Sequence, residues 1–333
     1  MASPLLQVED LCITFYTEDG PLPAVDHVSF TLNEGEVLGI VGESGAGKSQ
    51  TARALLRLIQ PPGKIIGGRV IFRGQDLLAL DELQMRDVRG GQISMIFQEP
   101  TASLNPIKSI GDQISRVVRL HKGLPAEEAR RLAVEMLHKV NISSPEERLD
   151  QYPYQFSGGM CQRVAIAMAL ACSPTLLIAD EPTTALDVTV QAQIMDLLEQ
   201  LRTETNMAII LISHDLRLVT DFCDKILVMY GGRAMEYGPT RQVDETPMHP
   251  YTRGLAAALP ALDDEGRRLA TIPGRVPNLL NLPPGCPFHP RCPEAKAVCG
   301  EMVPRLLEPA PDRKVACHLY DPAVAPKMMT EPA

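Results

Sequence analysis

Twenty residues, VLGIVGESGAGKSQTARALL from Val37 to Leu56, decide the fold of this chain. The apolar run that ends at Val41 predicts a buried strand, and the residues after Ser49 predict a helix. Between them lies a loop of the form glycine, any four residues, glycine-lysine-serine, residues 42–49. Its glycines allow backbone N–H groups to wrap around phosphates, and the following helix presents its positive N-terminus to the same anion. With a strand before it and a helix after it, this loop predicts a nucleoside triphosphate site rather than a chance glycine turn.

Each part of the loop has an expected role. Lys48 is expected to reach the β- and γ-phosphates, and Ser49 to hold Mg²⁺. The six residues before Lys48 are expected to contribute the backbone that surrounds the phosphates. They are Gly42, Glu43, Ser44, Gly45, Ala46 and Gly47.

A second apolar run, PTLLIADEP, ends in two adjacent acids, Asp180 and Glu181. Ligands of open α/β sheets bind at the carboxyl ends of the strands. We therefore expect Asp180 to order the Mg²⁺ shell and Glu181 to polarise the attacking water. A solvated acidic turn is the alternative, but it does not explain why an apolar strand ends at two charges.

Composition narrows the class of protein. The 333 residues carry a formal charge of -9, which argues against nucleic acid as the main partner. The longest nearly apolar run, Val164 to Cys172, is far shorter than the ~20 residues of a membrane span. No signal peptide is evident at the N-terminus. Eight cysteines without an export signal favour a reducing compartment, so we expect a cytoplasmic protein.

Proline marks the expected domain boundary. Seventeen of the 29 prolines lie from Pro239 onward. We expect an α/β body at about residues 1–240 and an irregular, proline-rich appendage at 241–333.

The segment FSGGMCQRVAIAMAL contains a second candidate anion site. Ser157, Gly158 and Gly159 open a predicted helix whose N-terminus can bind phosphate. Its apolar residues, Val164, Ile166, Met168 and Leu170, are expected to pack on the core.

These segments resemble the ATP-binding subunit of ABC transporters. The resemblance also includes Gln98 in MIFQEP, TALD at 184–187 and ISHD around His214, and all the motifs occur in that family's order. The resemblance implies a P-loop NTPase with a helical signature subdomain at about 100–170. It also implies that two such chains pair head to tail, so that the signature residues Ser157, Gly158, Gly159 and Met160 contact the partner's nucleotide. The signature has Met160 where the family often has Gln, but the Ser-Gly-Gly that contacts phosphate is intact.

The resemblance assigns further roles. Gln98 would sense the γ-phosphate and Mg²⁺, His214 would hold the γ-phosphate and the attacking water, and Asp187 would line the dimer seam. An aromatic residue of the family stacks on adenine. Phe15 aligns best with it and Tyr16 is the alternative, although either is equally compatible with ordinary core packing.

The whole chain resembles one subgroup, the oligopeptide and dipeptide importers, through TASLNPIKSIGDQI, TPMHPYTRGL and IPGRVPNLLNLPPGCPFHPRCP. This implies an ATPase that powers peptide import from the cytoplasmic face of the inner membrane. Its implied partners are a second, different ATP-binding subunit, two permeases and an extracytoplasmic peptide-binding protein. Other cargoes of this architecture, namely nickel, glutathione and opines, remain alternatives, as does a soluble ABC ATPase.

Four of the eight cysteines are gathered in the tail: Cys286, Cys292, Cys299 and Cys317. Four thiolates in a segment too rich in proline for a large core predict either a zinc site or a [4Fe–4S] cluster. Structural zinc more often uses cysteines two to four residues apart, and no such pair occurs here, so spacing favours the cluster. The importer resemblance also implies a cluster at this place, and we expect its role to be structural. The other four cysteines are expected to be ordinary buried or half-buried residues.

Overall fold

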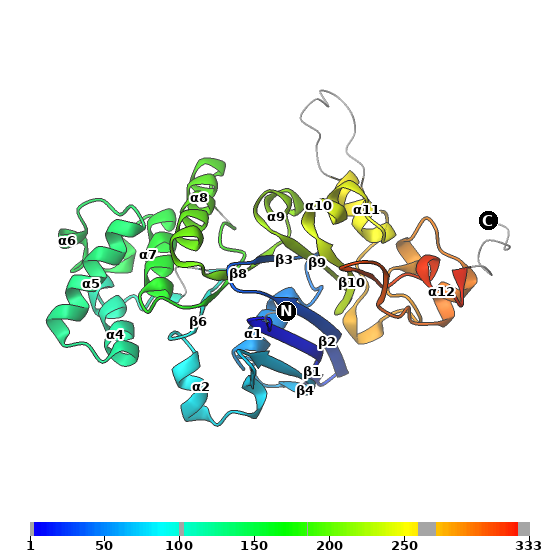
Figure 1. Ribbon diagram of the computed structural model, residues 1–333, viewed down its shortest axis with the longest axis horizontal. Coiled ribbons are helices and arrows are strands. Elements are labelled where there is room, and N and C mark those ends of the chain that lie inside the picture. Colours follow the sequence, from blue (N-terminus) through cyan, green and yellow to red (C-terminus); the bar gives the residue numbers. More distant parts are fainter. Residues whose placement is uncertain (1–2, 100–102, 185, 259–270, 326–333) are drawn as a thin grey trace. The chain divides into compact units, whose positions relative to one another are not determined.

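The computed structural model describes residues 3–99, 103–184, 186–258 and 271–325, which form two compact units (Figure 1). The first unit comprises Met1–Leu32, Val37–Leu78 and Ser213–Ala333, and the second comprises Asn33–Glu36 and Ala79–Ile212. Strands and helices occur in both, which confirms the predicted α/β class.

A mixed sheet forms the centre of the first unit. β3 (Val37–Val41) runs parallel to β9 (Lys225–Tyr230), and β10 (Arg233–Pro239) returns antiparallel to β9. All five residues of β3 are buried, which explains why this strand reads as a continuous apolar run. β3 leads through the phosphate loop, residues 42–49, into α1 (Lys48–Leu55), as the sequence predicted.

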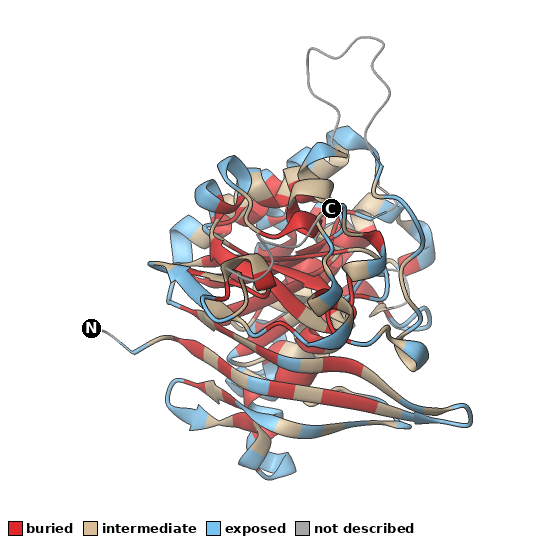
Figure 2. Cartoon of the chain, turned by 90° about the vertical axis from the view of Figure 1, so that its right-hand side faces the viewer, coloured by how far each residue is buried: buried red, intermediate tan, exposed pale blue. Residues whose placement is uncertain are grey.

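The other sheet of this unit has the strand order β2–β1–β4–β5 and is antiparallel. Its two longest strands carry bands of buried residues between exposed ones, as Figure 2 shows. Tyr237 of β10 donates its hydroxyl hydrogen to the Thr31 carbonyl at 3.0 Å and so joins the two sheets. The strands are β1 (Leu6–Thr17), β2 (Gly20–Leu32), β4 (Gly63–Phe72) and β5 (Gln75–Asp76).

The tail is mostly irregular, but it extends the mixed sheet by two short strands. β12 (Arg313–Val315) pairs antiparallel with β10, and β11 (Leu307–Ala310) pairs with β12. A buried ion pair between Arg313 and Glu236 joins β12 to β10. The other elements of the first unit are short helices: η1 (Leu77–Ala79, which ends in the second unit), α9 (Leu216–Phe222), α10 (Thr240–Glu245), α11 (Pro250–Ala257), η3 (Leu279–Asn281), η4 (His289–Arg291), α12 (Ala297–Glu301) and η5 (His318–Tyr320).

Three parallel strands organise the second unit, with β7 (Leu176–Asp180) between β6 (Ile93–Ile96) and β8 (Ala208–Ser213). Every residue of β7 and β8 is buried, as expected for strands covered on both faces. The helices of this unit are α2 (Glu82–Val88), α4 (Ile110–Lys122), α5 (Ala126–Lys139), α6 (Pro145–Arg148), η2 (Pro153–Gln155), α7 (Gly158–Leu170) and α8 (Val188–Thr205).

The prediction for the inward face of α7 was only half right. Val164 and Ile166 are buried, whereas Met168 and Leu170 are half-buried. Residues two apart point in different directions on a helix, so an alternating pattern cannot mark one face. α4, α5, α6 and α7 fall within the expected helical segment at 100–170, and the domain boundary near residue 240 stays a prediction. Across the described residues, no helix combines the length and apolarity that a membrane span requires.

Candidate functional site

The phosphate loop has the backbone that its glycines predict. Gly42 and Gly47 have φ angles of 154° and 97°, which L side chains rarely adopt. A Cβ atom on Gly42 would lie 2.2 Å from the Met229 carbonyl oxygen, and one on Gly47 would lie 2.4 Å from the Ala24 carbonyl oxygen. Both positions therefore require glycine for conformation and for space.

Lys48 occupies the interior of this loop. Its side chain is buried, and Nζ donates to the carbonyl oxygens of Gly42 at 2.7 Å and Glu43 at 3.2 Å. α1 begins at Lys48, so its N-terminal N–H groups lie at the same loop, beside Ser49. A buried ammonium group at a helix N-terminus is a suitable environment for a polyphosphate, and the half-buried Ser49 can supply a hydroxyl oxygen to Mg²⁺.

The acidic pair lies where the sequence predicted, at the carboxyl end of β7. Asp180 is fully buried, and Glu181 has a left-handed φ of 49°, a conformation uncommon for a residue other than glycine. The Glu181 Oε2 atom accepts hydrogen bonds from Gln98 Nε2 at 3.0 Å and from the Thr184 hydroxyl at 2.9 Å. The second unit thus brings Gln98 and Glu181 together, while Lys48, Ser49 and His214 belong to the first.

His214 and Asp187 both lie on exposed connections. His214 follows β8 in a bend and is exposed. Asp187 is exposed and caps α8 by accepting a hydrogen bond from Val190 N–H at 2.9 Å. Ala185, in the TALD segment, lies outside the described residues.

The signature segment forms an open helix N-terminus. Ser157 caps α7 by accepting a 3.3 Å hydrogen bond from Met160 N–H. Ser157 and Gly158 are exposed, and a Cβ on Gly158 would meet no heavy atom within 4 Å. The chain itself therefore leaves room for a ligand at this helix end.

The two aromatic candidates of β1 differ in environment. Phe15 is half-buried and pairs with Gly63 of β4, where a Cβ would lie 2.6 Å from its ring. Tyr16 is 52% exposed, and the Lys64 ammonium lies 5.8 Å from its ring centroid. Of the two, Tyr16 is the more exposed ring.

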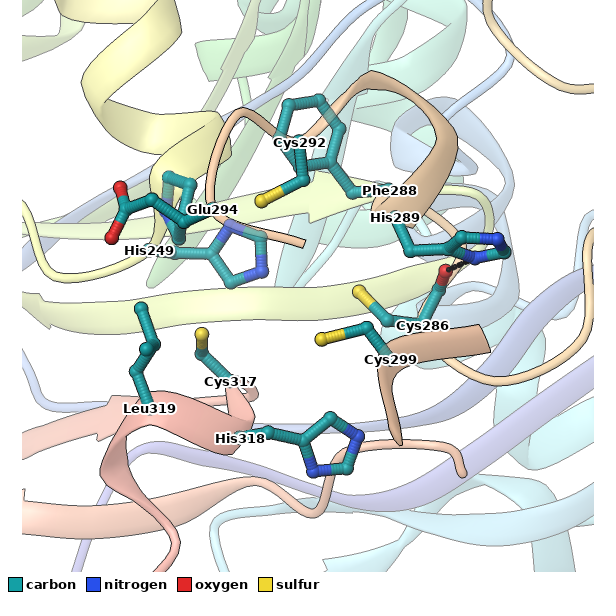
Figure 3. Close-up of a pocket in the computed structure, with 11 residues that line it drawn as sticks. His249, Cys286, Phe288, His289, Cys292, Glu294, Cys299, Cys317, His318 and Leu319 are labelled. Carbon is teal, nitrogen blue, oxygen red and sulfur yellow. Dashed lines mark hydrogen bonds between the residues drawn. The ribbon is translucent and has the colours of Figure 1, made fainter. Parts of the chain in front are cut away.

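The four tail cysteines line one pocket with an empty volume of about 330 Å³. They come from four different places, namely the turn before η4, the residue after it, α12 and the start of η5. Figure 3 shows their sulfur atoms pointing toward a common space. Hydrogen bonds hold the frame: Cys286 N–H donates to the Cys299 carbonyl at 2.8 Å, and Cys292 N–H donates to the His289 carbonyl at 3.2 Å.

The distance between the sulfur atoms distinguishes a zinc site from an iron–sulfur cluster. Tetrahedral zinc with Zn–S bonds near 2.3 Å places sulfur atoms about 3.8 Å apart. Within the described ranges, ligand atoms of three or more His, Cys, Asp or Glu residues come within 4.8 Å of one another only at Cys12, Asp26 and His27. No three of the four tail sulfurs therefore lie within 4.8 Å of one another. The donor set fits a multi-iron cluster better than a single ion.

The Cys12 group is accounted for by ion pairs. Asp26 Oδ2 accepts from Arg233 Nε at 2.7 Å, and Asp10 Oδ1 lies 2.6 Å from His27 Nδ1. We therefore assign no metal to it.

Burial raises the pKa of three tail thiols, Cys286, Cys292 and Cys317, and so favours their protonated form. It raises the pKa of Cys286 to about 11 and that of Cys317 to about 12, and the neighbouring cysteines add to both shifts. A cationic centre reverses this effect, because it stabilises thiolates directly.

Arg291 is the residue of this region that the sequence reasoning missed. It lies between Cys286 and Cys292, is 7% exposed, and forms a two-pronged ion pair with Glu43 of the phosphate loop. The one available signal was that Arg291 precedes Cys292, and this does not identify a partner 248 residues away.

Two family models match the chain. One described as ABC transporter covers residues 25–184, and one described as Oligopeptide/dipeptide transporter, C-terminal region, covers residues 235–299. The Oligopeptide transport ATP-binding protein OppD of Salmonella typhimurium is 55% identical over 316 residues, which are 95% of this chain and 94% of that protein. The Dipeptide transport ATP-binding protein DppD of Escherichia coli is 47% identical over 314 residues, which are 94% of this chain and 96% of that protein.

Solved structures of ATP-binding cassettes have a fold similar to that of this chain. A dimeric ATP-binding cassette in a post-hydrolysis state with ADP and Pi has a TM-score of 0.64 and 28% identity, and covers 71% of this chain and 99% of its own. The similarity of fold thus extends over the cassette.

Proposed function

This chain belongs to the oligopeptide/dipeptide transporter family of ABC transporter ATP-binding subunits, and on that premise we propose that it hydrolyses ATP to power the import of peptides. The observation that carries the peptide assignment is the extent of the similarity, which includes the tail as well as the cassette. A cassette alone says nothing about cargo, since many transporters share it.

The assignment is tested by reconstituting the complex in vesicles and measuring ATP hydrolysis with candidate cargoes. Short peptides, delivered with the extracytoplasmic binding protein, are expected to stimulate hydrolysis, whereas nickel, glutathione and opines are not. Stimulation by one of those three instead would replace the peptide assignment. Failure to purify from solubilised membranes with two hydrophobic subunits would favour a soluble ABC ATPase.

The residues of the nucleotide site have different roles. Lys48 neutralises the β- and γ-phosphates inside the loop, and Ser49, Asp180 and Gln98 would hold Mg²⁺, which would offset the charge that develops on the phosphates. Glu181 orients the attacking water, and its carboxylate is itself oriented by Gln98 and Thr184. His214 holds the γ-phosphate, and Tyr16, with its exposed ring, stacks on adenine.

The assembly that this site requires is a head-to-tail pair. The open helix end at Ser157, Gly158 and Gly159 serves the nucleotide of a second, different ATP-binding subunit, with Met160 beside it and Asp187 at the seam. Family membership implies membrane permeases as partners. We propose two of them, with a peptide-binding protein outside, which places this chain on the cytoplasmic face of the membrane.

The tail cysteines hold a [4Fe–4S] cluster of structural role. Two observations support this: the four cysteines line one pocket, and no three of their sulfurs lie within 4.8 Å of one another, whereas tetrahedral zinc brings all four closer than that. When bound, the cluster supplies four metal–thiolate links that staple a segment poor in core residues.

Anaerobically purified protein is expected to be brown and to contain about four iron atoms per chain. Cys292→Ser should bleach it, whereas Cys172→Ser, at a half-buried cysteine outside the pocket, should leave the iron content unchanged. One zinc per chain in colourless anaerobic protein would overturn the cluster assignment.

A further inference from the structure

A tail arginine reaches into the nucleotide loop of the same unit. Arg291 Nη1 donates to Glu43 Oε2 at 2.6 Å, and Nη2 donates to Glu43 Oε1 at 3.1 Å. The Arg291 side chain is 5% exposed and that of Glu43 is 27% exposed. Two parallel, charge-assisted hydrogen bonds of this kind fix direction as well as distance, because the guanidinium fork is planar.

The other donors of Arg291 are also occupied. Nε donates to the Pro273 carbonyl at 2.8 Å, Nη1 donates to the Tyr230 hydroxyl at 3.1 Å, and Nη2 lies 3.4 Å from the Ile272 carbonyl. The guanidinium group therefore has one position, set by the tail on one side and by β9 on the other.

Glu43 is held a second time, through its backbone. Its N–H donates to the Tyr251 hydroxyl at 2.9 Å. Tyr251 packs against Tyr230 and Phe288, with ring centroids 4.7 Å and 5.2 Å away. Phe288 lies between Cys286 and Cys292, so the same cysteine segment carries both the arginine and the ring that supports the tyrosine.

From these contacts we propose that Arg291 is a positioning residue for ATP binding, which holds the phosphate loop through Glu43, and that assembly of the cysteine centre places Arg291. Arg291 contacts the carboxylate of Glu43, and the backbone carbonyl of the same residue accepts from Lys48 Nζ at 3.2 Å. Loss of the pair frees the start of the loop and weakens ATP binding. The second half of the proposal rests on the metal centre proposed above.

A double-mutant cycle tests the first half. In the purified complex, Arg291→Gln and Glu43→Gln are each expected to weaken MgATP binding about tenfold, since hydrogen bonds between charged groups contribute on that order. The double variant should be no weaker than either single variant, because both changes remove the same interaction. The effect should fall on the KM for ATP rather than on kcat, and Arg291→Lys, which keeps the charge but not the fork, should restore only part of the affinity.

The controls separate positioning from folding. Arg305→Gln removes a tail arginine that pairs with Asp321 at 3.0 Å rather than with a residue of the loop, and should leave ATP affinity unchanged. Glu43→Gln lies outside the tail, so its iron content should match that of the wild type. Fully additive losses in the double variant, or equal losses in Arg305→Gln, would overturn the role of Arg291.

Metal depletion tests the second half. Removing the metal with a chelator should weaken MgATP binding in the wild type, and should have little further effect in Glu43→Gln, where the link is already broken. An equal loss in both proteins would show that the centre acts by another route. If the metal proves to be zinc, the cluster assignment fails while the Arg291–Glu43 cycle keeps its meaning, so the two failures are distinguishable.

Discussion

The side-chain amide of Gln98 donates a 3.0 Å hydrogen bond to Oε2 of Glu181. The Thr184 hydroxyl donates to the same oxygen at 2.9 Å, and Glu181 N–H donates to the Ile212 carbonyl at 3.0 Å. These contacts hold a residue whose left-handed backbone is unfavourable by roughly 1–3 kcal/mol. Strain of this kind persists where surrounding contacts fix the residue, and here Gln98 and Thr184 both fix the carboxylate.

Glu181→Gln is expected to lower kcat for ATP hydrolysis by about 100-fold or more while MgATP still binds, because an amide cannot accept a proton from water as a carboxylate does. Single-turnover hydrolysis and nucleotide retention, measured in the complex, check this. Thr184→Val removes one donor to the same oxygen and should cost less activity. Turnover by Glu181→Gln at the wild-type rate would refute the assignment of this carboxylate.

A substitution in the signature helix distinguishes the chain's own ATP binding from its role at the partner's nucleotide. Gly158→Gln adds a side chain where a Cβ meets open space, so the fold and the chain's own ATP binding should be unchanged. Hydrolysis by the assembled complex should nevertheless fall, because the new side chain occupies the room left for the partner's nucleotide. Lys48→Ala should do the opposite and weaken ATP binding on this chain. If Gly158→Gln hydrolyses ATP normally, the shared-site model is wrong.

Dilution offers an independent check of that model. The isolated chain is expected to hydrolyse ATP poorly at low concentration, and its rate per chain should rise when the second ATPase and the permeases are added. Sedimentation measured alongside the rate identifies the active species. Brisk turnover by a proven monomer would contradict a site completed by a partner.

The two aromatic residues of β1 predict different phenotypes. Tyr16→Ala is expected to raise the Kd for ATP about tenfold, since stacking of an aromatic ring on a base contributes on the order of 1–3 kcal/mol. Phe15→Ala should instead lower stability, because its ring packs against Gly63. Binding of ATP and of triphosphate alone, compared in each variant, checks the assignment. If a variant lost affinity for triphosphate as well as for ATP, neither ring would be the one that stacks on adenine.

How far the sequence predicts this site depends on the range of each interaction. The loop at 42–49 and the acids after β7 are encoded in adjacent residues, so their local structure follows from spacing. The partner of Arg291 could not be predicted, because no local pattern relates it to Glu43. β11 and β12 are too short, and too close to prolines, to stand out from the tail. The choice between Phe15 and Tyr16 stays a prediction; strand alternation places Phe15 on the same face as the buried Ile13.

The ion pair between Glu236 and Arg313 predicts how firmly the tail is attached to the cassette. Glu236 is fully buried and also accepts hydrogen bonds from the N–H groups of Met248 and His249, both at 2.9 Å. Arg313 also donates to the carbonyls of Gln242 and Thr246 at 3.1 Å and 3.0 Å. The pair therefore ties β12 to β10 and to the connection between α10 and α11.

Removal of one partner leaves the other buried without its counter-charge. Glu236→Gln and Arg313→Met are each expected to lower the free energy of unfolding by about 3–5 kcal/mol. The double variant should lose clearly less than the sum, because no buried charge remains, and the glutamine oxygen still accepts one of the two N–H groups. Urea unfolding followed by circular dichroism measures these losses. Arg241→Gln breaks an exposed pair with Glu245 and should leave the unfolding midpoint unchanged, since exposed pairs contribute little. Strictly additive losses in the double variant would mean that the two side chains stabilise the tail through separate contacts rather than through each other.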